Sequence, residues 1–273
     1  MQNEKYQKLT EILAGMGSVV VAYSGGTDST LVLKVAHDIL GDKALAMTAV
    51  SASLPAADRL AAGQIARQIG AQHILVESAE TSDPEYLANT PNRCFFCKKE
   101  TYGILSAYAG EHGFQVIVDG TNADDTGDYR PGRKAAGTYH VRSPLLEAGF
   151  TKAEIRQLSK ELGLPNWDKP AAACLSSRIP YGTPITLAAL SQVERAEALL
   201  HGLGLRQLRV RHHGPVARIE AEPGDFACLL EHRDEIVAAL KAIGYMYVSL
   251  DLAGFRSGSL NDALSRTGAQ AGE

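Results

Sequence analysis

A continuous apolar run near the N-terminus stops at a pair of glycines, and this junction limits the fold more than any other feature of the sequence. Residues 18–24 read Ser-Val-Val-Val-Ala-Tyr-Ser, and Gly25 and Gly26 follow at once. An unbroken β-branched run is typical of a strand buried on both faces of a parallel sheet. Helical spacing begins at residues 29–40, so the sequence predicts a strand, a tight turn and a helix in direct succession.

A turn of this kind can bind an anion. Ser24, Gly25 and Gly26 can place consecutive backbone N–H groups around a concave nest. Asp28 and Ser29 then open a helix whose positive dipole end faces the nest, which suits a phosphate or pyrophosphate group. The loop is not an NTPase P-loop, which requires a lysine, and the dinucleotide pattern G-x-G-x-x-G is absent. The alternative without a ligand is a glycine turn that opens a helix capped by Thr27 or Asp28.

Strands and helices alternate along the first two thirds of the chain. Beyond the first junction we predict strands at 44–53, 71–78 and the start of 114–125, and helices at 3–15, 58–70, 98–113 and 151–165. This alternation predicts an α/β fold with a parallel sheet, in which ligands bind beyond the carboxyl ends of the strands. The glycine turn, the loop with Gly120, Thr121 and Asn122, and a loop-rich cysteine segment after the third strand should therefore share one edge.

The pattern changes near residue 185. A helix at 187–204, two strands within 206–222, a helix at 224–244 and a strand at 245–252 predict a small α+β domain. We therefore expect a parallel-sheet domain at residues 1–184, a smaller domain at 185–262 and a disordered polar tail at 263–273.

Composition narrows the possible functions. The chain has 273 residues, 45% apolar and 21% charged, which suits two globular domains that fold without disulfides. No apolar run approaches the roughly 18 residues of a membrane span, and the N-terminus lacks the apolar segment of a signal peptide. The net charge of −4 counts against a broad nucleic-acid surface. We expect a cytoplasmic protein whose partners include neither a membrane nor a nucleic acid.

Three of the four cysteines stand in settings that favour reactive thiolates. Cys94 and Cys97 form a C-x-x-C pair flanked by basic residues, and Arg178 follows Cys174 by four positions. Positive neighbours stabilise a thiolate. The C-x-x-C pair by itself fits zinc, a redox disulfide or an iron–sulfur cluster, and a lone cysteine is most often inert packing. Cys228 lies in an amphipathic helix, where packing is the preferred interpretation.

Two further groups of charged residues could contact a nucleotide or another anion. Asp124 and Asp125, with Asp28, are candidate Mg²⁺ ligands, and among the first two we favour Asp125. Arg209 and Arg211 lie two apart on a predicted strand and so share one face. Arginine suits phosphate or carboxylate there, and a solvated strand face is the alternative.

The glycine turn and its surroundings resemble a known superfamily. The segment SGGTDST after a buried strand resembles the signature of pyrophosphate-loop (PP-loop) ATPases, which transfer AMP to a substrate oxygen and release pyrophosphate. A closer resemblance, to the LarE family of ATP-dependent sulfur transferases in nickel-pincer nucleotide cofactor synthesis, rests on RCFFCKK, DGTNADD, PAAACLSSRIPYGTPIT, RVRHHGPVARIE and DLAGFRSGSLN. It implies an adenine nucleotide alpha hydrolase-like, Rossmann-like first domain.

The resemblance also implies a reaction and its participants. ATP would adenylylate a carboxylate of a pyridinium dicarboxylate mononucleotide, and sulfur would then displace AMP and leave a thiocarboxylate. The glycine loop with Gly120, Thr121 and Asn122 would bind ATP and its Mg²⁺. Cys174 would handle the transferred sulfur, and Arg178 would lie near the reacting carboxylate. A glutamate of the helix at 187–204 would lie at the substrate site, for which we choose Glu197 over Glu194, although either could be a surface carboxylate. Arg209 and Arg211 would bind the substrate phosphate. Members of the family assemble as homo-oligomers, so the same is expected here.

The sulfur source separates two forms of the family. One sacrifices the sulfur of a single cysteine, which becomes dehydroalanine, and the other holds a [4Fe–4S] cluster on three cysteines and recharges. Cys94, Cys97 and Cys174 favour the cluster form, fed by sulfide or another sulfur donor. A sacrificial Cys174 and a zinc site stay open, as do three other functions: a PP-loop tRNA thiolase, an amidating ligase and a nucleotide-binding regulatory module.

Overall fold

The computed structural model describes four stretches of the chain, residues 2–127, 132–170, 173–256 and 258–262. The predicted disordered tail at 263–273 lies outside these residues. Contacts divide the chain into two compact units, the first made of residues 1–86 and 92–172 and the second of 87–91 and 173–273. This division falls before residue 173, whereas the sequence pattern places the boundary after residue 184.

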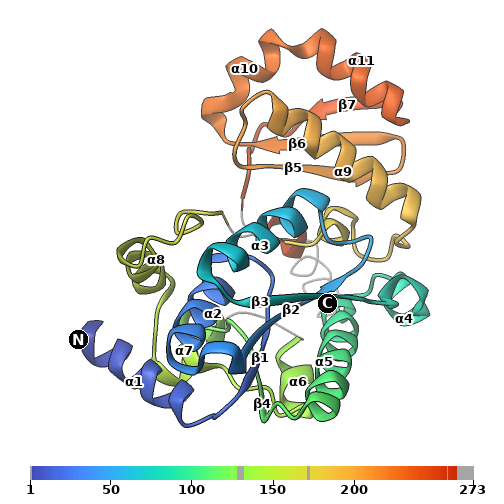
Figure 1. The fold of residues 1–273 in the computed structure, drawn as a ribbon. Helices are drawn as coiled ribbons and strands as arrows, with labels where there is room; N and C mark the ends of the chain where they lie inside the picture. The colour runs from blue at the N-terminus through green and yellow to red at the C-terminus, as the bar shows by residue number, and fades with distance from the viewer. Residues whose placement is uncertain (1, 128–131, 171–172, 257, 263–273) are drawn as a thin grey trace, which may run out of the picture. The chain divides into compact units, whose positions relative to one another are not determined.

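The first unit is built on a parallel sheet (Figure 1). The strand order is β3-β2-β1-β4, with β1 at Val19–Ala22, β2 at Ala44–Val50, β3 at Gln72–Glu77 and β4 at Val116–Val118. All three strand pairs are parallel, as the alternating pattern predicts. Because β1 lies between β2 and β4, the loops that follow β1 and β4 leave the sheet side by side.

Helices connect and cover these strands (Figure 1). Their bounds are α1 Gln2–Ala14, α2 Thr27–Leu40, α3 Ala56–Ile69, α4 Pro84–Leu87, α5 Arg93–His112, α6 Gly132–Thr138, α7 Pro144–Ala148 and α8 Lys152–Glu161. α8 begins with a capping box formed by Thr151 and Glu154. The prediction of a loop around the cysteine pair is wrong, because α5 begins at Arg93 and carries both cysteines in its first turns. No helix among the described residues is long and apolar enough to cross a membrane.

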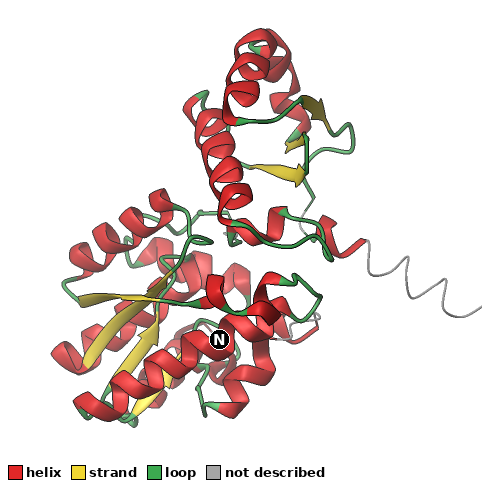
Figure 2. Cartoon of the chain, turned by 90° about the vertical axis from the view of Figure 1, so that its right-hand side faces the viewer, coloured by secondary structure: helices red, strands yellow, loops and turns green. Residues whose placement is uncertain are grey.

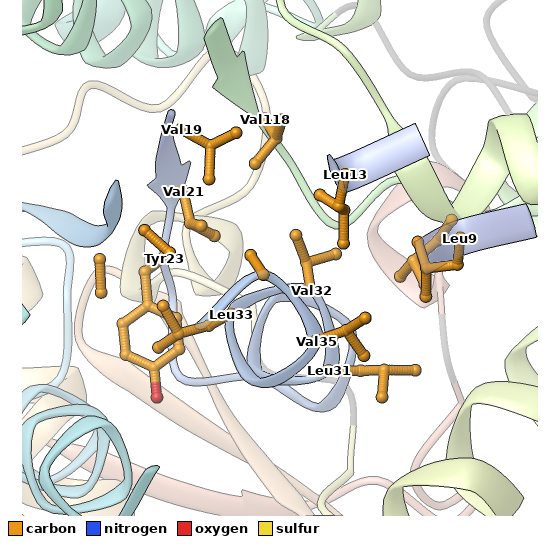
Figure 3. Packing of buried hydrophobic residues seen from close by; sticks show 14 of the residues in the cluster. Leu9, Leu13, Val19, Val21, Tyr23, Leu31, Val32, Leu33, Val35 and Val118 are labelled. Atoms are coloured by element: carbon orange, nitrogen blue, oxygen red, sulfur yellow. The ribbon is translucent and has the colours of Figure 1, made fainter. Parts of the chain in front are cut away.

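The valines of β1 are buried on both faces of the sheet. Val19 and Val21 pack in one core with α1 and with Val32 of α2 (Figure 3). Val20 points the other way and packs in a second core with Leu105 of α5. Each aliphatic side chain buried in this way contributes roughly 1.5–3 kcal/mol. The two cores hold β1 from both sides and so fix the start of the glycine loop that follows it.

The second unit is a small α+β structure with its own core (Figure 2). Its sheet has the order β5-β6-β7, and its elements are α9 Leu187–Gly202, β5 Leu208–His213, β6 Val216–Ala221, α10 Phe226–Glu231, α11 Arg233–Ile243 and β7 Tyr247–Leu250. β5 and β6 are antiparallel, and β6 and β7 are parallel. The single helix predicted at 224–244 is two helices, because the backbone at His232 leaves the helical region with φ −93° and ψ 15°.

One face of the second sheet is apolar and the other is charged. Leu208 and Val210 of β5 belong to the core formed with α9 and α11. Arg209 and Arg211 alternate with them and therefore occupy the opposite face. The shared face predicted for the two arginines is thus confirmed. Cys228 is half-buried and packs against the core, in agreement with its interpretation as a packing residue.

Candidate functional site

Gly25 is required in the glycine loop for two separate reasons. Its φ is +67°, in the left-handed region that glycine enters without strain. A Cβ at this position would also lie 2.6 Å from the Cβ of Ala62 on α3, closer than two carbons can approach. The loop therefore runs tightly against the middle of α3, and any side chain at Gly25 would push it away.

The start of α2 leaves its first-turn N–H groups open. Gly26 is the N-cap residue and has no side chain to accept from them, so the interpretation of Asp28 as the cap is wrong. Ser24 and Ser29 close the loop instead, with their hydroxyl oxygens 3.1 Å apart. The Gly26 N–H donates to Ser24 Oγ at 3.3 Å. An uncapped helix start beside a tight glycine turn is suited to an anion.

A segment far along the chain donates hydrogen bonds to the backbone carbonyl of Gly25 in this loop. The buried amide Nδ2 of Asn166 donates to the Gly25 carbonyl at 3.1 Å and to Thr30 Oγ1 at 2.9 Å. Thr27 Oγ1 donates to the Asn166 carbonyl at 2.9 Å, and Lys169 Nζ lies 3.5 Å from the Gly25 oxygen. Because the Gly25 carbonyl accepts from these donors, the N–H groups on the other side of the loop stay available to a ligand. Sequence reasoning missed Asn166, which lies more than 130 positions from the loop.

The loop after β4 packs directly on the glycine loop. A Cβ at Gly120 would lie 2.8 Å from Ser29 N and 3.1 Å from Asp28 Cβ. Asp119 anchors this second loop, accepting from Thr121 Oγ1 at 2.9 Å and from its N–H at 3.1 Å. The structure therefore brings Gly120 and Thr121 to the glycine loop, as the shared edge of the sheet predicts.

The predicted nucleotide loops also gather opposite charges. Asp28 forms an ion pair with Lys152 of α8, whose Nζ lies 2.6 and 2.7 Å from the two carboxylate oxygens. Burial raises the pKa of Asp28, and Lys152 opposes that shift. Asp125 Oδ2 accepts from Asn122 N–H at 3.0 Å, and Asp124 Oδ2 accepts from Lys152 N–H at 2.8 Å. Asp28 thus already has a cation, and Asp125 stays a prediction as a Mg²⁺ ligand.

The cysteine pair lies at the start of α5. Cys94 is exposed and Cys97 is half-buried, and their spacing places them on one side of the helix. The Arg93 guanidinium approaches Cys94 Sγ at 4.0 Å. Burial acts against the charge of Lys98, but Tyr102, Asp119 and Cys97 nearby raise its pKa overall. A helix start with basic neighbours favours thiolates.

A chain of polar contacts connects the cysteine helix to the loop after β4. Lys98 Nζ lies 5.2 Å from the centre of the Tyr102 ring, and the Tyr102 hydroxyl donates to Asp119 at 3.0 Å. Burial, opposed by Lys98 and supported by Asp119, raises the pKa of Tyr102 to about 12, so it stays a neutral donor. The start of α5 is in this way tied to the same edge of the sheet as the nucleotide loops.

The third candidate cysteine belongs to the second unit. Cys174 is half-buried and directly precedes a short 3-10 helix at Leu175–Arg178. Arg178 is buried, and its Nη1 donates to the Cys174 carbonyl at 2.9 Å. Its Nε and Nη2 donate to the two carboxylate oxygens of Glu197 on α9, at 2.9 and 2.8 Å. Arg178 and Glu197 therefore fix the backbone that carries Cys174.

Glu197 connects that backbone to the arginine strand. Its Oε1 also accepts from the N–H of Val210 in β5 at 2.9 Å. Arg178 and Glu197 are therefore in direct contact, which a shared role at the substrate carboxylate would require. The contacts that the structure shows for them hold the backbone at Cys174 and at Val210. Whether they also touch a reacting carboxylate stays a prediction.

The two strand arginines have different surroundings. Arg211 is buried, and its Nη2 donates to Glu220 Oε2 and to Ser259 Oγ, each at 2.7 Å. Arg209 lies over the Phe255 ring at 5.2 Å. Burial, with Arg178 and Arg211 nearby, lowers the pKa of Arg209 to about 10, which still leaves it charged. Arg209 is therefore the better placed of the two to exchange its contacts for those of a phosphate.

The metal predictions involve residues of both units. Cys94 and Cys97 lie in the first unit and Cys174 in the second. Across the described part of the chain, no three His, Cys, Asp or Glu side chains form a group that could hold a metal ion. The thiol pair at the start of α5 fits two ligands of an iron–sulfur cluster, and the cluster itself stays a proposal.

A parallel sheet with an uncapped glycine loop between β1 and α2, joined at the same edge by the glycine loop after β4, defines an α/β protein of the PP-loop type. No protein-family model matches the chain. A chain of the glutamine-hydrolyzing GMP synthase of Thermoplasma volcanium is 26% identical over 56% of this chain and 54% of its own. That likeness agrees with a PP-loop fold.

Two relatives match almost the whole chain. A protein of Synechocystis, named only as uncharacterized, is 45% identical over 97% of this chain and 100% of its own. The pyridinium-3,5-bisthiocarboxylic acid mononucleotide synthase of Lactiplantibacillus plantarum is 40% identical over 96% of this chain and 95% of its own. The chain belongs to the family of that synthase, the LarE family.

Proposed function

We propose that this protein is an ATP-dependent sulfur transferase that converts a carboxylate of a pyridinium dicarboxylate mononucleotide into a thiocarboxylate for nickel-pincer cofactor synthesis. The observation that carries the proposal is the 40% identity to the Lactiplantibacillus plantarum synthase, because it spans both units. The open glycine loop supports the use of ATP.

The first half of the reaction would take place at the glycine loop. An oxygen of the substrate carboxylate attacks the α-phosphorus of ATP, forming an acyl adenylate and releasing pyrophosphate. The loop N–H groups between Ser24 and Ser29 stabilise the charge that develops on the leaving pyrophosphate. Mg²⁺ with Asp125 would neutralise part of the same charge. Adenylylation matters because it turns a poor leaving oxygen into AMP.

The second half requires a sulfur nucleophile. Hydrosulfide attacks the acyl carbon, the bond from that carbon to the bridging oxygen breaks so that AMP leaves with this oxygen, and one proton is released as the thiocarboxylate forms. A [4Fe–4S] cluster on Cys94, Cys97 and Cys174, when bound, would supply and replenish that sulfide. Arg209 and Arg211 would hold the substrate phosphate through paired N–H donors.

The test is anaerobic reconstitution with iron and sulfide, followed by ATP, Mg²⁺, sulfide and the pyridinium dicarboxylate mononucleotide. Mass spectrometry of product and protein should show the thiocarboxylate and repeated turnover at unchanged protein mass. Pyrophosphate release should depend on the pyridinium compound. Product formation without ATP would refute the proposal, and preferential thiolation of added tRNA would support a tRNA thiolase instead.

Cysteine variants distinguish the two possible sulfur sources. Cys94→Ala and Cys97→Ala should each lower iron content and multiple-turnover sulfur transfer, because each removes one cluster ligand. Cys228→Ala is the matched control, since Cys228 packs against the core of the second unit. If Cys174 is sacrificial, the pair variants should be nearly silent. Each chain would then work once and lose about 34 Da, the mass of H₂S, a loss that thiol oxidation cannot produce.

A further inference from the structure

A short stretch just before the cysteine helix belongs to the second unit and not to the first. Residues 87–91 run from the last residue of α4 to the loop before α5, yet their contacts group them with residues 173–273. The chain therefore passes from one unit to the other at three points, after residues 86, 91 and 172. The sequence pattern, which predicts a single boundary after residue 184, indicates neither of the first two.

Asn89 lies at the centre of this stretch and is fully buried. Its relative exposure is 0%, whereas the residues on either side of it are exposed. Its amide Nδ2 donates to the carbonyls of Ile179, Pro180 and Thr183, at 3.2, 2.8 and 2.9 Å. In the opposite direction, the Gly182 N–H donates to the Asn89 carbonyl at 3.0 Å. Asn89 is therefore hydrogen-bonded to one segment of the second unit through both its side chain and its backbone.

Asparagine suits this position for two reasons. Its φ is +51°, in the left-handed region that asparagine enters more readily than most residues. Its amide also supplies two N–H donors for the surrounding carbonyls, so that the polar group is not buried unpaired. The Ile185 N–H adds a bond to the Leu87 carbonyl at 2.9 Å. We call these contacts between residues 87–91 and 179–185 the Asn89 clasp.

The two segments that carry the candidate cluster ligands both adjoin this clasp. Cys94 follows Asn89 by five positions, and Cys174 precedes Ile179 by the same number. Five residues reach at most roughly 18 Å when fully extended. The second connection is shorter, because the 3-10 helix at Leu175–Arg178 rises only about 2 Å per residue. A cluster on three cysteines must gather them, and the entropy that this costs is smaller when the chain between them is short.

We propose that Asn89 is a positioning residue for the three-cysteine iron–sulfur site, whose clasp keeps residues 87–91 on the second unit and so holds the C-x-x-C pair within reach of Cys174. This inference rests on the proposed function, which assigns the cluster to Cys94, Cys97 and Cys174. Asn89 acts through the backbone that it holds and not by contact with the cluster.

The test cross-links thiols with a bismaleimide in the reduced, iron-free full chain and identifies the linked peptides by mass spectrometry. In the wild type, Cys174 should be linked to Cys94 or Cys97, and the pair should also be linked within itself. Asn89→Gly removes the amide and lets the backbone keep its positive φ. It should lower the Cys174 cross-links severalfold, because the effective concentration of Cys174 at the pair falls. The link within the pair should not change, since both of its cysteines belong to α5.

Iron content is the second measurement, and a core variant is its control. After anaerobic reconstitution, Asn89→Gly should hold less iron per chain than the wild type. Leu240→Ala opens a cavity in the core of the same unit but lies outside the clasp. Both variants should unfold at lower urea, and Leu240→Ala alone should keep the wild-type cross-links and iron. Equal losses in both variants, or unchanged Cys174 cross-links in Asn89→Gly, would overturn the assignment.

If Asn89→Gly fails to fold, hydrogen exchange of the wild type takes its place. Because linkage is reciprocal, a cluster that the clasp supports must in turn stabilise the clasp. Reconstitution should therefore slow the exchange of the Gly182 and Ile185 N–H groups, and unchanged exchange at both would overturn the assignment.

The cluster and the assignment of Asn89 can fail separately. A wild type that forms the Cys174 cross-links but holds no iron would refute the cluster, while loss of those cross-links in Asn89→Gly would still support Asn89 as the residue that positions the thiols. A wild type that holds iron, with an Asn89→Gly variant that matches it in iron and cross-links, would refute the assignment alone. A wild type with neither iron nor Cys174 cross-links would refute both.

Discussion

Glycine is required at position 25 for two independent reasons. Its positive φ selects glycine for the backbone, and the contact with Ala62 selects glycine again for packing. Asn166 acts on the same loop from behind, holding the Gly25 carbonyl with its amide. The anion site therefore depends on residues that touch no anion, and their effects should appear in nucleotide binding as well as in stability.

Gly25→Ala should abolish ATP-dependent pyrophosphate release and lower the free energy of unfolding. The added Cβ would meet Ala62 at 2.6 Å and displace the loop. Gly41→Ala is the matched control, because Gly41 also has a positive φ of +57° but open space around it. It should cost only the backbone strain, about 1–2 kcal/mol, and keep pyrophosphate release. Near-normal turnover in Gly25→Ala would contradict the loop assignment.

At the scale of elements, α8 is the helix whose local design matters most for the site. Its capping box fixes where the helix begins, and Lys152 is the first residue after the cap. Lys5 of α1 reaches Glu154 at 2.7 Å and reinforces the same end. α5 has the corresponding role for the cysteine pair, because the residue at which this helix begins determines which way both thiols face.

The stability of the capping box should depend on pH. The hydrogen bond from Lys5 and those from Thr151 lower the pKa of Glu154 from its usual 4.5 to about 2. A carboxyl whose pKa is lower in the folded state stabilises the fold above its unfolded pKa and loses that effect as the pH falls toward the folded value. The difference in urea midpoint between wild type and Glu154→Gln should therefore be largest above pH 4.5 and shrink as the pH approaches about 2.

Glu161→Gln is the control for this measurement, since it removes a carboxylate from the other end of α8 without touching the cap. It should stay within about 0.5 kcal/mol of the wild type. A difference between Glu154→Gln and wild type that does not change with pH would show that the carboxylate charge contributes nothing.

At the scale of the molecule, the residues proposed for ATP and those proposed for the substrate belong to two units with separate cores. The glycine loop belongs to the first unit, and the arginine strand and Cys174 belong to the second. Substitutions on the arginine strand should therefore affect the nucleotide little.

Arg209→Ala should weaken binding of the pyridinium mononucleotide by about one to two decades and leave ATP binding unchanged. Arg211→Ala should instead lower the unfolding free energy by about 1.5–3 kcal/mol, the effect of one charge-assisted hydrogen bond, because it removes one of the two arginines that pair with the buried Glu220 and leaves Arg218 in place. Titration with each ligand and urea unfolding separate the two effects. Equal losses of ATP and substrate affinity in Arg209→Ala would show that the strand does not belong to a separate substrate site.

Much of this architecture is predictable from sequence because it depends on local patterns. The valine run, the glycine turn and the helical spacing after it lie within about twenty consecutive residues, and their order alone predicts the parallel sheet and its anion-binding edge. The capping box and the alternation of Arg209 and Arg211 are equally local. The cysteine helix is the exception, because the prolines and polar residues before it suggest a loop that continues through both cysteines, whereas α5 already begins at Arg93.

The contacts that complete the site are those that only the tertiary structure decides. Asn166 meets Gly25, Lys152 meets Asp28, and Glu197 joins Arg178 to Val210, each across a separation in sequence that no periodic pattern spans. A local pattern records which backbone a segment prefers, whereas the partner of a buried polar group is chosen by packing. The sequence by itself therefore determined the class of fold and the place of the glycine loop, and the tertiary structure decided which side chains surround that loop.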